Sequence, residues 1–211
     1  MLENCEPVDL ALGELLGEPA EAIRYAYFPV GGLISLLANA EGHANLEVCL
    51  IGNEGMFSPS SMLGFDVPPL RALVQGAGRA LRIRTVDLRN AASDSAPLRE
   101  MLNRYLCVVI AELAQTAVCN RFHMIEAQLA RWLLMTHDRG SSDRLELTHG
   151  VLATMIGVRR SGISVAAAAL QARKAIRYGR GEIHILDRDR LEAASCECYR
   201  ASAATYRRYM G

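Results

Sequence analysis

The sequence has no net charge, which at first argues against an anionic partner such as nucleic acid. Its 211 residues include 23 Lys and Arg and 23 Asp and Glu. These charges are unevenly placed: residues 1–120 carry 8 basic and 14 acidic side chains, whereas residues 121–211 carry 15 basic and 9 acidic ones. Opposite charge in two halves is typical of a chain with two tasks, one of which involves an anion. Nucleic acid is therefore not excluded.

Long apolar segments are also missing. Residues 1–6 are acidic and no apolar run follows them, unlike a secretory signal. The longest apolar stretch, Tyr105 to Val118, is interrupted by Glu112 and Gln115 and is too short to cross a bilayer. We expect a cytoplasmic protein without a membrane partner.

The cysteines lack the spacing of a disulfide scaffold or a metal site. Cys5, Cys49, Cys107 and Cys119 do not form the cluster that iron–sulfur ligation needs. Neither Cys196-Glu197-Cys198 nor the five histidines have a spacing typical of metal ligands. We expect free thiols in a reducing compartment, ordinary histidines and no cofactor.

Catalytic motifs are missing as well. The chain has no P-loop, His-Glu-x-x-His or nucleophile elbow. A metal enzyme built on a β-barrel would need converging His and carboxylate ligands, and the barrel segment contains only His43. We expect no catalytic site.

The first third of the chain predicts short antiparallel strands. Turn signals such as Pro29 with Gly31-Gly32, and Gly76-Ala77-Gly78, separate the apolar runs, and no amphipathic helix lies between them. This pattern is typical of a barrel or jelly roll, which often holds a small ligand. The predicted strands are Ile23–Phe28, Leu33–Ala38, Leu46–Ile51, Leu70–Val74 and Ala80–Ile83.

A long helix is predicted from Leu98 to about Arg121, where Gly and Pro are absent. Apolar residues recur there at spacings of three and four, which places them on one stripe. At 1.5 Å per residue the helix would be roughly 36 Å long, more than a small barrel can cover. We therefore favour a helix pair across a dimer axis over packing wholly within one chain. The expected interface residues are Leu102, Leu106, Val109, Ile110, Leu113 and Ala117.

The C-terminal part contains the spacing of a helix-turn-helix. A helix beginning at Ile125 and ending near Gly140 precedes it, and Thr148 is a suitable N-cap for the first helix of the motif. Gly157 can adopt the positive φ that the tight turn requires. Ala153 is small where the two helices would cross closely, and the apolar residues that would fill the wedge between them are Leu152, Ile156, Val158, Ile163 and Ala166.

Positive charge gathers on this motif. Between Arg144 and Arg180 there are seven basic residues and one acid, Glu146. Arg159 and Arg160 begin the second helix, the end that usually enters the major groove, where Arg can bind guanine O6 and N7. The segment Ile176 to Leu186 predicts two strands around a Gly-Arg-Gly turn, which places Arg180 at the tip of a wing suited to phosphate or minor-groove contact. Together these features favour DNA binding.

The sequence resembles the Crp–Fnr family of bacterial transcription regulators over nearly its whole length. Tyr27 to Leu36 and Glu47 to Met56 resemble the sensor β-roll of one subgroup. Glu126 to Arg139 resembles the helix that opens the DNA-binding domain, and Leu147 to Asp187 resembles the winged helix-turn-helix. The resemblance implies a homodimer joined by the long helix, with a signal at the β-roll changing how two winged domains meet a palindromic site.

The predicted recognition helix departs from the family pattern at three positions. Well-known members open the recognition helix with Ser, then Arg-Glu, then a second Arg four residues after the Glu. Here the matching positions are Arg159, Arg160, Ser161 and Val165, so that only Arg160 carries over and the best-known operator cannot be assumed. Val165 can offer an apolar contact, for example to a thymine methyl group.

The predicted sensor domain also departs from the family pattern. Cyclic-nucleotide binders of the family use a Gly-Glu pair for the ribose and an Arg-Ser or Arg-Thr step for the phosphate. This sequence has no matching Gly-Glu, and its nearest phosphate step is Arg71-Ala72. A cyclic nucleotide is therefore disfavoured, and the weak candidates for an effector pocket are Ser58, Ser60, Ser61 and Arg71.

We therefore expect an α+β chain in four segments. Residues 1–97 would form a β-roll or jelly-roll sensor, and residues 98–121 a dimerisation helix. A winged helix-turn-helix would follow over residues 122–193, with its motif at about 149–170, and residues 194–211 would form a tail. Its partners would be double-stranded DNA with a palindromic site, a second copy and RNA polymerase. The expected DNA-contacting residues are Thr148, Arg159, Arg160, Ser161, Ser164, Val165 and Arg180. The alternative is a small-molecule sensor whose basic domain binds a protein.

Overall fold

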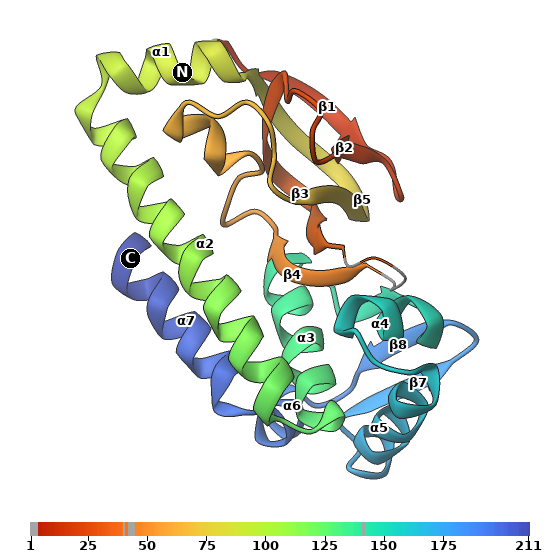
Figure 1. Ribbon diagram of the computed structural model, residues 1–211. Coiled ribbons are helices and arrows are strands. Elements are labelled where there is room, and N and C mark those ends of the chain that lie inside the picture. Colours follow the sequence, from red (N-terminus) through yellow and green to blue (C-terminus); the bar gives the residue numbers. More distant parts are fainter. Residues whose placement is uncertain (1–3, 40, 42–44, 141) are drawn as a thin grey trace.

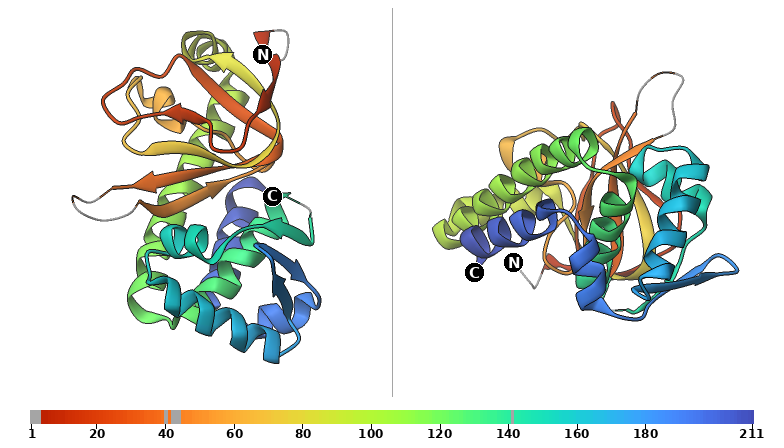
Figure 2. Two further views of the ribbon diagram at one scale, coloured as in Figure 1. Left: turned by 90° about the vertical axis from the view of Figure 1, so that its right-hand side faces the viewer. Right: turned by 90° about the horizontal axis from the view of Figure 1, so that it is seen from below.

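The computed structural model describes residues 4–39, 41, 45–140 and 142–211. Two halves stack end to end, and one long helix runs past both of them (Figures 1 and 2). The N-terminal half is an antiparallel five-stranded sheet, and the C-terminal half is helical with a small three-stranded sheet. This is the α+β architecture that the sequence predicts. His43, named above as the one histidine of the barrel segment, lies outside the described residues.

The N-terminal sheet has the strand order β1-β5-β3-β4, with β2 also pairing with β5. Its alternating apolar residues, among them Ile34, Ile51 and Val74, point inward and form a core with Phe57. The short 3-10 helix η2 (Pro59–Leu63) lies beside it. The strands are β1 (Glu6–Leu10), β2 (Leu15–Gly17), β3 (Tyr25–Ala38), β4 (Leu46–Ile51) and β5 (Arg71–Arg84).

The predicted breaks at Gly31-Gly32 and Gly76-Ala77-Gly78 are wrong, because β3 and β5 each continue through them as one 14-residue strand. The glycines let the two backbones approach closely where the register of pairing shifts. A Cβ on Gly78 would lie 2.1 Å from the carbonyl oxygen of Gly31, and one on Gly32, whose φ is +104°, would lie 2.9 Å from that of Gly76. Close approach, and not chain reversal, is the reason for glycine at these positions.

The predicted long helix is confirmed as α2 (Ala96–Phe122), capped by the Ser95 side chain at Leu98 N. It follows the shorter α1 (Thr85–Asp94). By length and composition alone α2 could cross a membrane, a property that core helices of soluble proteins share. Here it packs against α7 and β4 and its buried face includes the carboxylate of Glu112.

The C-terminal half consists of α3 (Ile125–Gly140), β6 (Arg144–Glu146), α4 (His149–Ile156), α5 (Arg160–Ala172), β7 (Ile176–Gly179), β8 (Glu182–Ile185), α6 (Arg188–Ala194) and α7 (Glu197–Met210). One apolar core joins α3, α4, α5 and the sheet β6-β8-β7, and Leu37 of β3 reaches into it. The two halves therefore share buried surface.

Residues 194–211, expected as a tail, contain the helix α7. It lies along α2 in all views, and its direction is opposite to that of α2 (Figures 1 and 2). Tyr199 and Ser202 are buried, and Tyr206, Tyr209 and Met210 pack against the core that contains Leu102 and Tyr105 of α2. This spacing of three and four is the amphipathic signal that predicts a helix.

The strand crossing gives a test of the fold. We expect Gly78→Ala to lower the free energy of unfolding by about 2 kcal/mol or more, because the new Cβ would force the β3 and β5 backbones apart. The matched control is Gly31→Ala, since a Cβ there has open space within 4 Å; its cost should stay below about 1 kcal/mol. Urea unfolding of both variants measures the difference, and equal losses would contradict the crossing.

Candidate nucleic-acid interface

The helices α4 and α5 form the predicted helix-turn-helix, with a bend of 107° between them. The Thr148 hydroxyl caps α4 by accepting a hydrogen bond from Val151 N at 3.2 Å. Gly157 ends α4 with a φ of +74°. A Cβ on Gly157 would meet Leu46 of β4 at 2.7 Å, so the turn also lies against the N-terminal half. Both the cap and the turn agree with the sequence prediction.

One face of α5 is buried and the other is open. Ile163, Ala166, Ala167 and Leu170 pack into the core of the C-terminal half. The expected DNA-contacting residues Arg160, Ser161, Ser164 and Val165 all lie on the exposed face, and Val165 is 72% exposed. An apolar side chain this exposed beside arginines suits contact with a base methyl group.

The N-terminus of α5 has no side-chain cap. Arg159 occupies the N-cap position with an extended backbone, and its guanidinium makes no capping hydrogen bond. The first backbone N–H groups of α5 are therefore not satisfied by a cap, which leaves the positive end of the helix dipole available to an anion. A phosphate is the anion that a helix in a DNA groove would meet there.

His149 joins the motif to the wing and was not singled out from the sequence. Its Nδ1 lies 3.0 Å from the Ser164 hydroxyl, which itself donates to the Arg160 carbonyl at 3.1 Å. Its ring stacks on Tyr178 of β7 with 4.0 Å between centroids. Burial and the nearby charge of Arg160 lower the pKa of His149. His149 thus connects the start of α5 with the wing through one hydrogen bond and one ring contact.

The wing is the hairpin β7 and β8, whose turn contains Arg180 with a φ of +55° and Gly181 with a φ of +80°. Two successive positive φ values are those of a type I′ turn, in which glycine is favoured at the second position. β6, which the sequence did not predict because it is three residues long, adds the third strand beside β8. Arg180 is exposed at the tip, as expected.

Ion pairs divide the basic residues of this region into two groups. Arg173 pairs with Glu126 at 2.8 Å, and Arg144 pairs with Glu182 and Glu146. Within the described part of the chain no ion pair involves the other five basic residues, all of them exposed, which are Arg159, Arg160, Lys174, Arg177 and Arg180. Positive charge is therefore left uncompensated around the start of α5 and the wing tip.

Both the helix-turn-helix and the overall fold have counterparts among known proteins. Residues 127–194 match the family model of the Crp-like helix-turn-helix domain. The chain contains a Crp-like helix-turn-helix domain within a Crp–Fnr regulator fold. The fold follows from solved structures that superpose on nearly the whole chain, whereas no curated protein sequence matches it significantly.

Three of these structures are FixK2 from Bradyrhizobium japonicum, TTHB099 and TTHA1359, the latter two being CRP-type transcriptional regulators from Thermus thermophilus. FixK2 has a TM-score of 0.75 and 14% identity, with 91% of this chain and 98% of FixK2 covered. TTHB099 has a TM-score of 0.72 and 16% identity, with 89% and 96% covered. TTHA1359 has a TM-score of 0.68 and 21% identity, with 90% and 98% covered.

The residues expected for an effector pocket are already bonded to neighbouring groups or buried, and none of them lines the cavity between the two halves described below. Ser58 and Ser61 are buried at η2, where the Ser61 hydroxyl donates to the Ser58 carbonyl at 2.8 Å. Ser60, in the same short helix, is half-buried. Arg71, the expected phosphate-binding residue, pairs with Glu18 at 2.8 Å. The Glu18 carboxylate thus occupies the place beside the Arg71 guanidinium that a phosphate would take.

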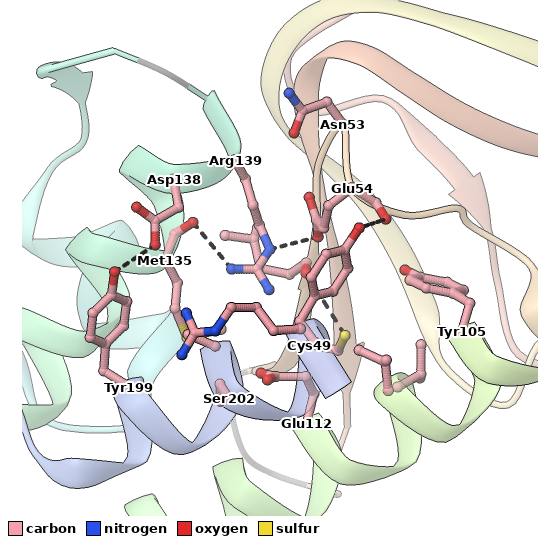
Figure 3. A pocket seen from close by; sticks show the side chains of 16 residues that line it. Cys49, Asn53, Glu54, Tyr105, Glu112, Met135, Asp138, Arg139, Tyr199 and Ser202 are labelled. Carbon is pink, nitrogen blue, oxygen red and sulfur yellow. Dashed lines mark hydrogen bonds and ion pairs between the residues drawn. The ribbon is translucent and has the colours of Figure 1, made fainter. Parts of the chain in front are cut away.

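A cavity of about 220 Å³ lies instead between the two halves of the chain (Figure 3). Its walls come from β4 and the following loop, α2, α3 and α7. Arg139 of α3 crosses it to bind Glu54 at 2.7 Å and also donates to the Met135 carbonyl. Tyr199 of α7 donates to Asp138 at 2.8 Å in the same wall. A ligand bound in this cavity would therefore contact both halves of the chain.

The predicted apolar stripe of α2 divides into two faces. Leu102 and Val109 are buried inside the chain, which corrects their assignment to a dimer interface. Leu106 and Leu113 are half-buried, Ala117 is exposed and Ile110 is 65% exposed. The sequence predicted a single stripe because apolar residues lie on both faces. The packing of α7 and the β-roll covers only one of them.

A buried carboxylate also joins the two halves. Glu47 of β4 accepts hydrogen bonds from Trp132 Nε1 of α3 at 2.7 Å and from the Ser35 hydroxyl of β3. Burial raises the pKa of Glu47 to about 7, and the two hydrogen bonds offset part of this shift. The protonated form of Glu47 is therefore favoured in the folded protein up to about neutral pH.

This carboxylate predicts a pH dependence of stability. The folded state keeps the Glu47 proton between the ordinary pKa of 4.5 and about 7, whereas the unfolded chain loses it, so the stabilisation is complete below 4.5 and is lost as pH rises through that interval. Glu47→Gln mimics the protonated form. We expect its stability relative to wild type to rise by a few kcal/mol from pH 5 to pH 8.

Urea unfolding at both pH values measures this difference. The control is Glu100→Gln on the exposed face of α2, whose relative stability should change by less than about 0.5 kcal/mol over the same range. A pH dependence of Glu47→Gln identical to that of wild type would contradict the proposed protonation.

Proposed function

We propose that this chain is a homodimeric, sequence-specific transcription regulator that reads a palindromic DNA site with α5 in the major groove. The observation that carries the proposal is the exposed face of α5, where arginines without ion pairs, an uncapped helix end and an exposed valine lie together. Arginine and apolar side chains read base edges, and helix N-termini bind phosphate. The matched helix-turn-helix model supports the same surface.

Different roles are expected for different residues of this surface. Arg160 begins α5 and is a candidate for two hydrogen bonds to a guanine. Val165 would lie against a thymine methyl group, and Ser161 would contact the next base edge or phosphate. Arg159, Arg180 and the exposed backbone beside Thr148 would hold the phosphates on either side. Ser164 already binds His149 and Arg160, so its role would be to position Arg160.

The exposed face of α2 is the proposed dimer interface. Ile110, Leu106, Leu113 and Ala117 lie three or four residues apart and form a stripe on the side away from the buried Glu112 and Thr116. An apolar groove beside this stripe is lined by Leu113 and Ala117 and by residues of β4 and the loop before β5. A symmetric helix pair along this stripe would present two winged domains to two half-sites about one DNA turn apart.

A signal at the β-roll would act through the contacts between the two halves. Leu46 against Gly157 and Glu47 against Trp132 both run from β4 to the DNA-binding half. The cavity around Arg139 is bounded by the same strand. A ligand or chemical change that shifts β4 would thus move the winged domain, whereas the family's cyclic-nucleotide chemistry is not supported by Ser58, Ser60, Ser61 and Arg71.

The DNA experiment begins with selection of bound fragments from random duplexes, which reports half-site sequence and symmetry. On the selected site, we expect Arg160→Ala to cost about 1–3 kcal/mol and to relax the preference at one base pair per half-site. Arg180→Ala should weaken all sequences equally and reduce the slope of log affinity against log salt by about 1 per contact.

The matched control for both variants is Arg79→Ala, an exposed arginine of β5 in the N-terminal half, which should leave DNA affinity unchanged. Salt-independent binding by the wild type would contradict the proposal. If instead a protein partner were captured equally well after nuclease treatment while no duplex sequence was enriched, the basic surface would be a protein-binding site.

The dimer interface has its own test. Ile110→Asp places a charge on the proposed stripe, and we expect it to convert the dimer to a monomer in sedimentation equilibrium. The control is Met101→Asp: Met101 is also exposed, at 58%, but nine residues away it lies on the opposite side of the helix. A dimer that survives Ile110→Asp would place the interface elsewhere.

A further inference from the structure

Four potential metal ligands meet where the end of α2 contacts the start of α7. Cys119 lies in the last turn of α2 and His123 is its C-cap, while Cys196 is the N-cap of α7 and Cys198 lies in its first turn. Three Sγ atoms and one imidazole nitrogen all lie within 4.8 Å of one another. The cysteines are buried and His123 is about one-fifth exposed. Only the packing of α7 on α2 brings these residues together.

The distances fit a tetrahedron around one small cation. Cys119 Sγ and Cys196 Sγ are 3.5 Å apart, as are Cys198 Sγ and His123 Nδ1. With zinc bonds of about 2.3 Å to sulfur and 2.0–2.1 Å to nitrogen, a tetrahedron has edges of about 3.8 Å between sulfurs and about 3.6 Å between sulfur and nitrogen. Two of the six edges are thus within about 0.3 Å of these values, and the other pairs lie within 4.8 Å, so inward shifts of up to about 1 Å would place all four atoms at bonding distance.

The groups around the cluster are those that support a metal ligand. The second nitrogen of His123, Nε2, lies 3.1 Å from the Glu197 carboxylate. A carboxylate on the far nitrogen fixes the tautomer and orientation of a metal-binding histidine. The Gln128 side chain donates to the carbonyls of Cys119 and His123 at 3.2 and 2.8 Å and so holds the backbone of both residues. This arrangement leaves His123 Nδ1 directed at the thiols.

We propose that Cys119, His123, Cys196 and Cys198 form a Cys3His site for a thiophilic divalent cation, with zinc as the expected metal. Binding would replace three thiol protons by one Zn²⁺ and release those protons to solvent. With four protein ligands and no open position, the site belongs to the structural type.

The site lies at the joint between the two halves of the chain. His123 ends α2 and, two residues later, Ile125 begins α3, the first helix of the C-terminal half. A metal would tie this joint to α7, which packs along α2. The metal site does not depend on DNA binding, so either proposal can fail without the other.

The test uses the full-length protein, purified under reducing conditions and stripped of metal, and titrated with Co²⁺ as a spectroscopic probe. We expect one Co²⁺ per chain, with thiolate charge-transfer and tetrahedral d–d absorption bands, and displacement of Co²⁺ by stoichiometric Zn²⁺. Cys198→Ser should abolish these bands or weaken binding by about 100-fold or more. The control Cys107→Ser removes an exposed thiol of α2 outside the cluster and should leave them unchanged.

A second variant tests the site even if the cysteine variants fail to fold. Glu197→Gln keeps all four ligands and removes only the carboxylate beside His123, so we expect a normal spectrum with metal affinity lowered about 10-fold to 100-fold. The proposal is overturned if the reduced wild type shows no tetrahedral thiolate spectrum. It is also overturned if Cys119 and Cys196 are joined by a disulfide that re-forms in preference to metal binding.

Discussion

The buried side chain of Arg131 is the point at which three helices of this protein are held together. It extends from α3 and donates to Glu112 and Thr116 of α2, both at 3.4 Å, and to Ser202 of α7 at 3.5 Å. Arg131 and Glu112 are both less than a tenth exposed. Removing one member of such a pair typically costs about 3–5 kcal/mol, because the other charge stays buried without a partner. The pair therefore disfavours any packing in which α2, α3 and α7 separate.

This constraint also fixes the contacts between the two halves of the chain. With α3 fixed against α2, the next residue, Trp132, is directed at Glu47 of β4, and Gly157 lies against Leu46. Arg139, two turns further along α3, reaches Glu54 in the loop after β4. The helix-turn-helix half is thus linked to the β-roll mainly through β4, together with Leu37 of β3, which reaches into the C-terminal core.

Much of this arrangement could be predicted from local sequence. The spacing of apolar residues predicted α2 and α3, and Thr148, Gly157 and Arg180 marked the cap, the turn and the wing tip at their observed positions. Each of these is decided by neighbours along the chain. The glycines of β3 and β5 were misinterpreted because their reason lies across the sheet, where Gly78 meets Gly31. Burial of Leu102 and Val109 likewise depends on residues far from α2 in the sequence, in the β-roll and in α7.

The cysteine and histidine cluster is the clearest case of information that spacing alone does not contain. Cys196 and Cys198 are separated by one residue, which is not by itself a typical metal-binding spacing, and Cys119 lies 77 residues before Cys196. Only a helix that runs back along α2 can join them. The charges are also separated along α2: the acidic β-roll lies at one end of this helix and the basic wing and α5 at the other (Figure 1). Because like charges repel, a polyanion approaching this chain would be directed to the winged end. The zero net charge conceals this separation, in which the excess of basic side chains lies at the winged end.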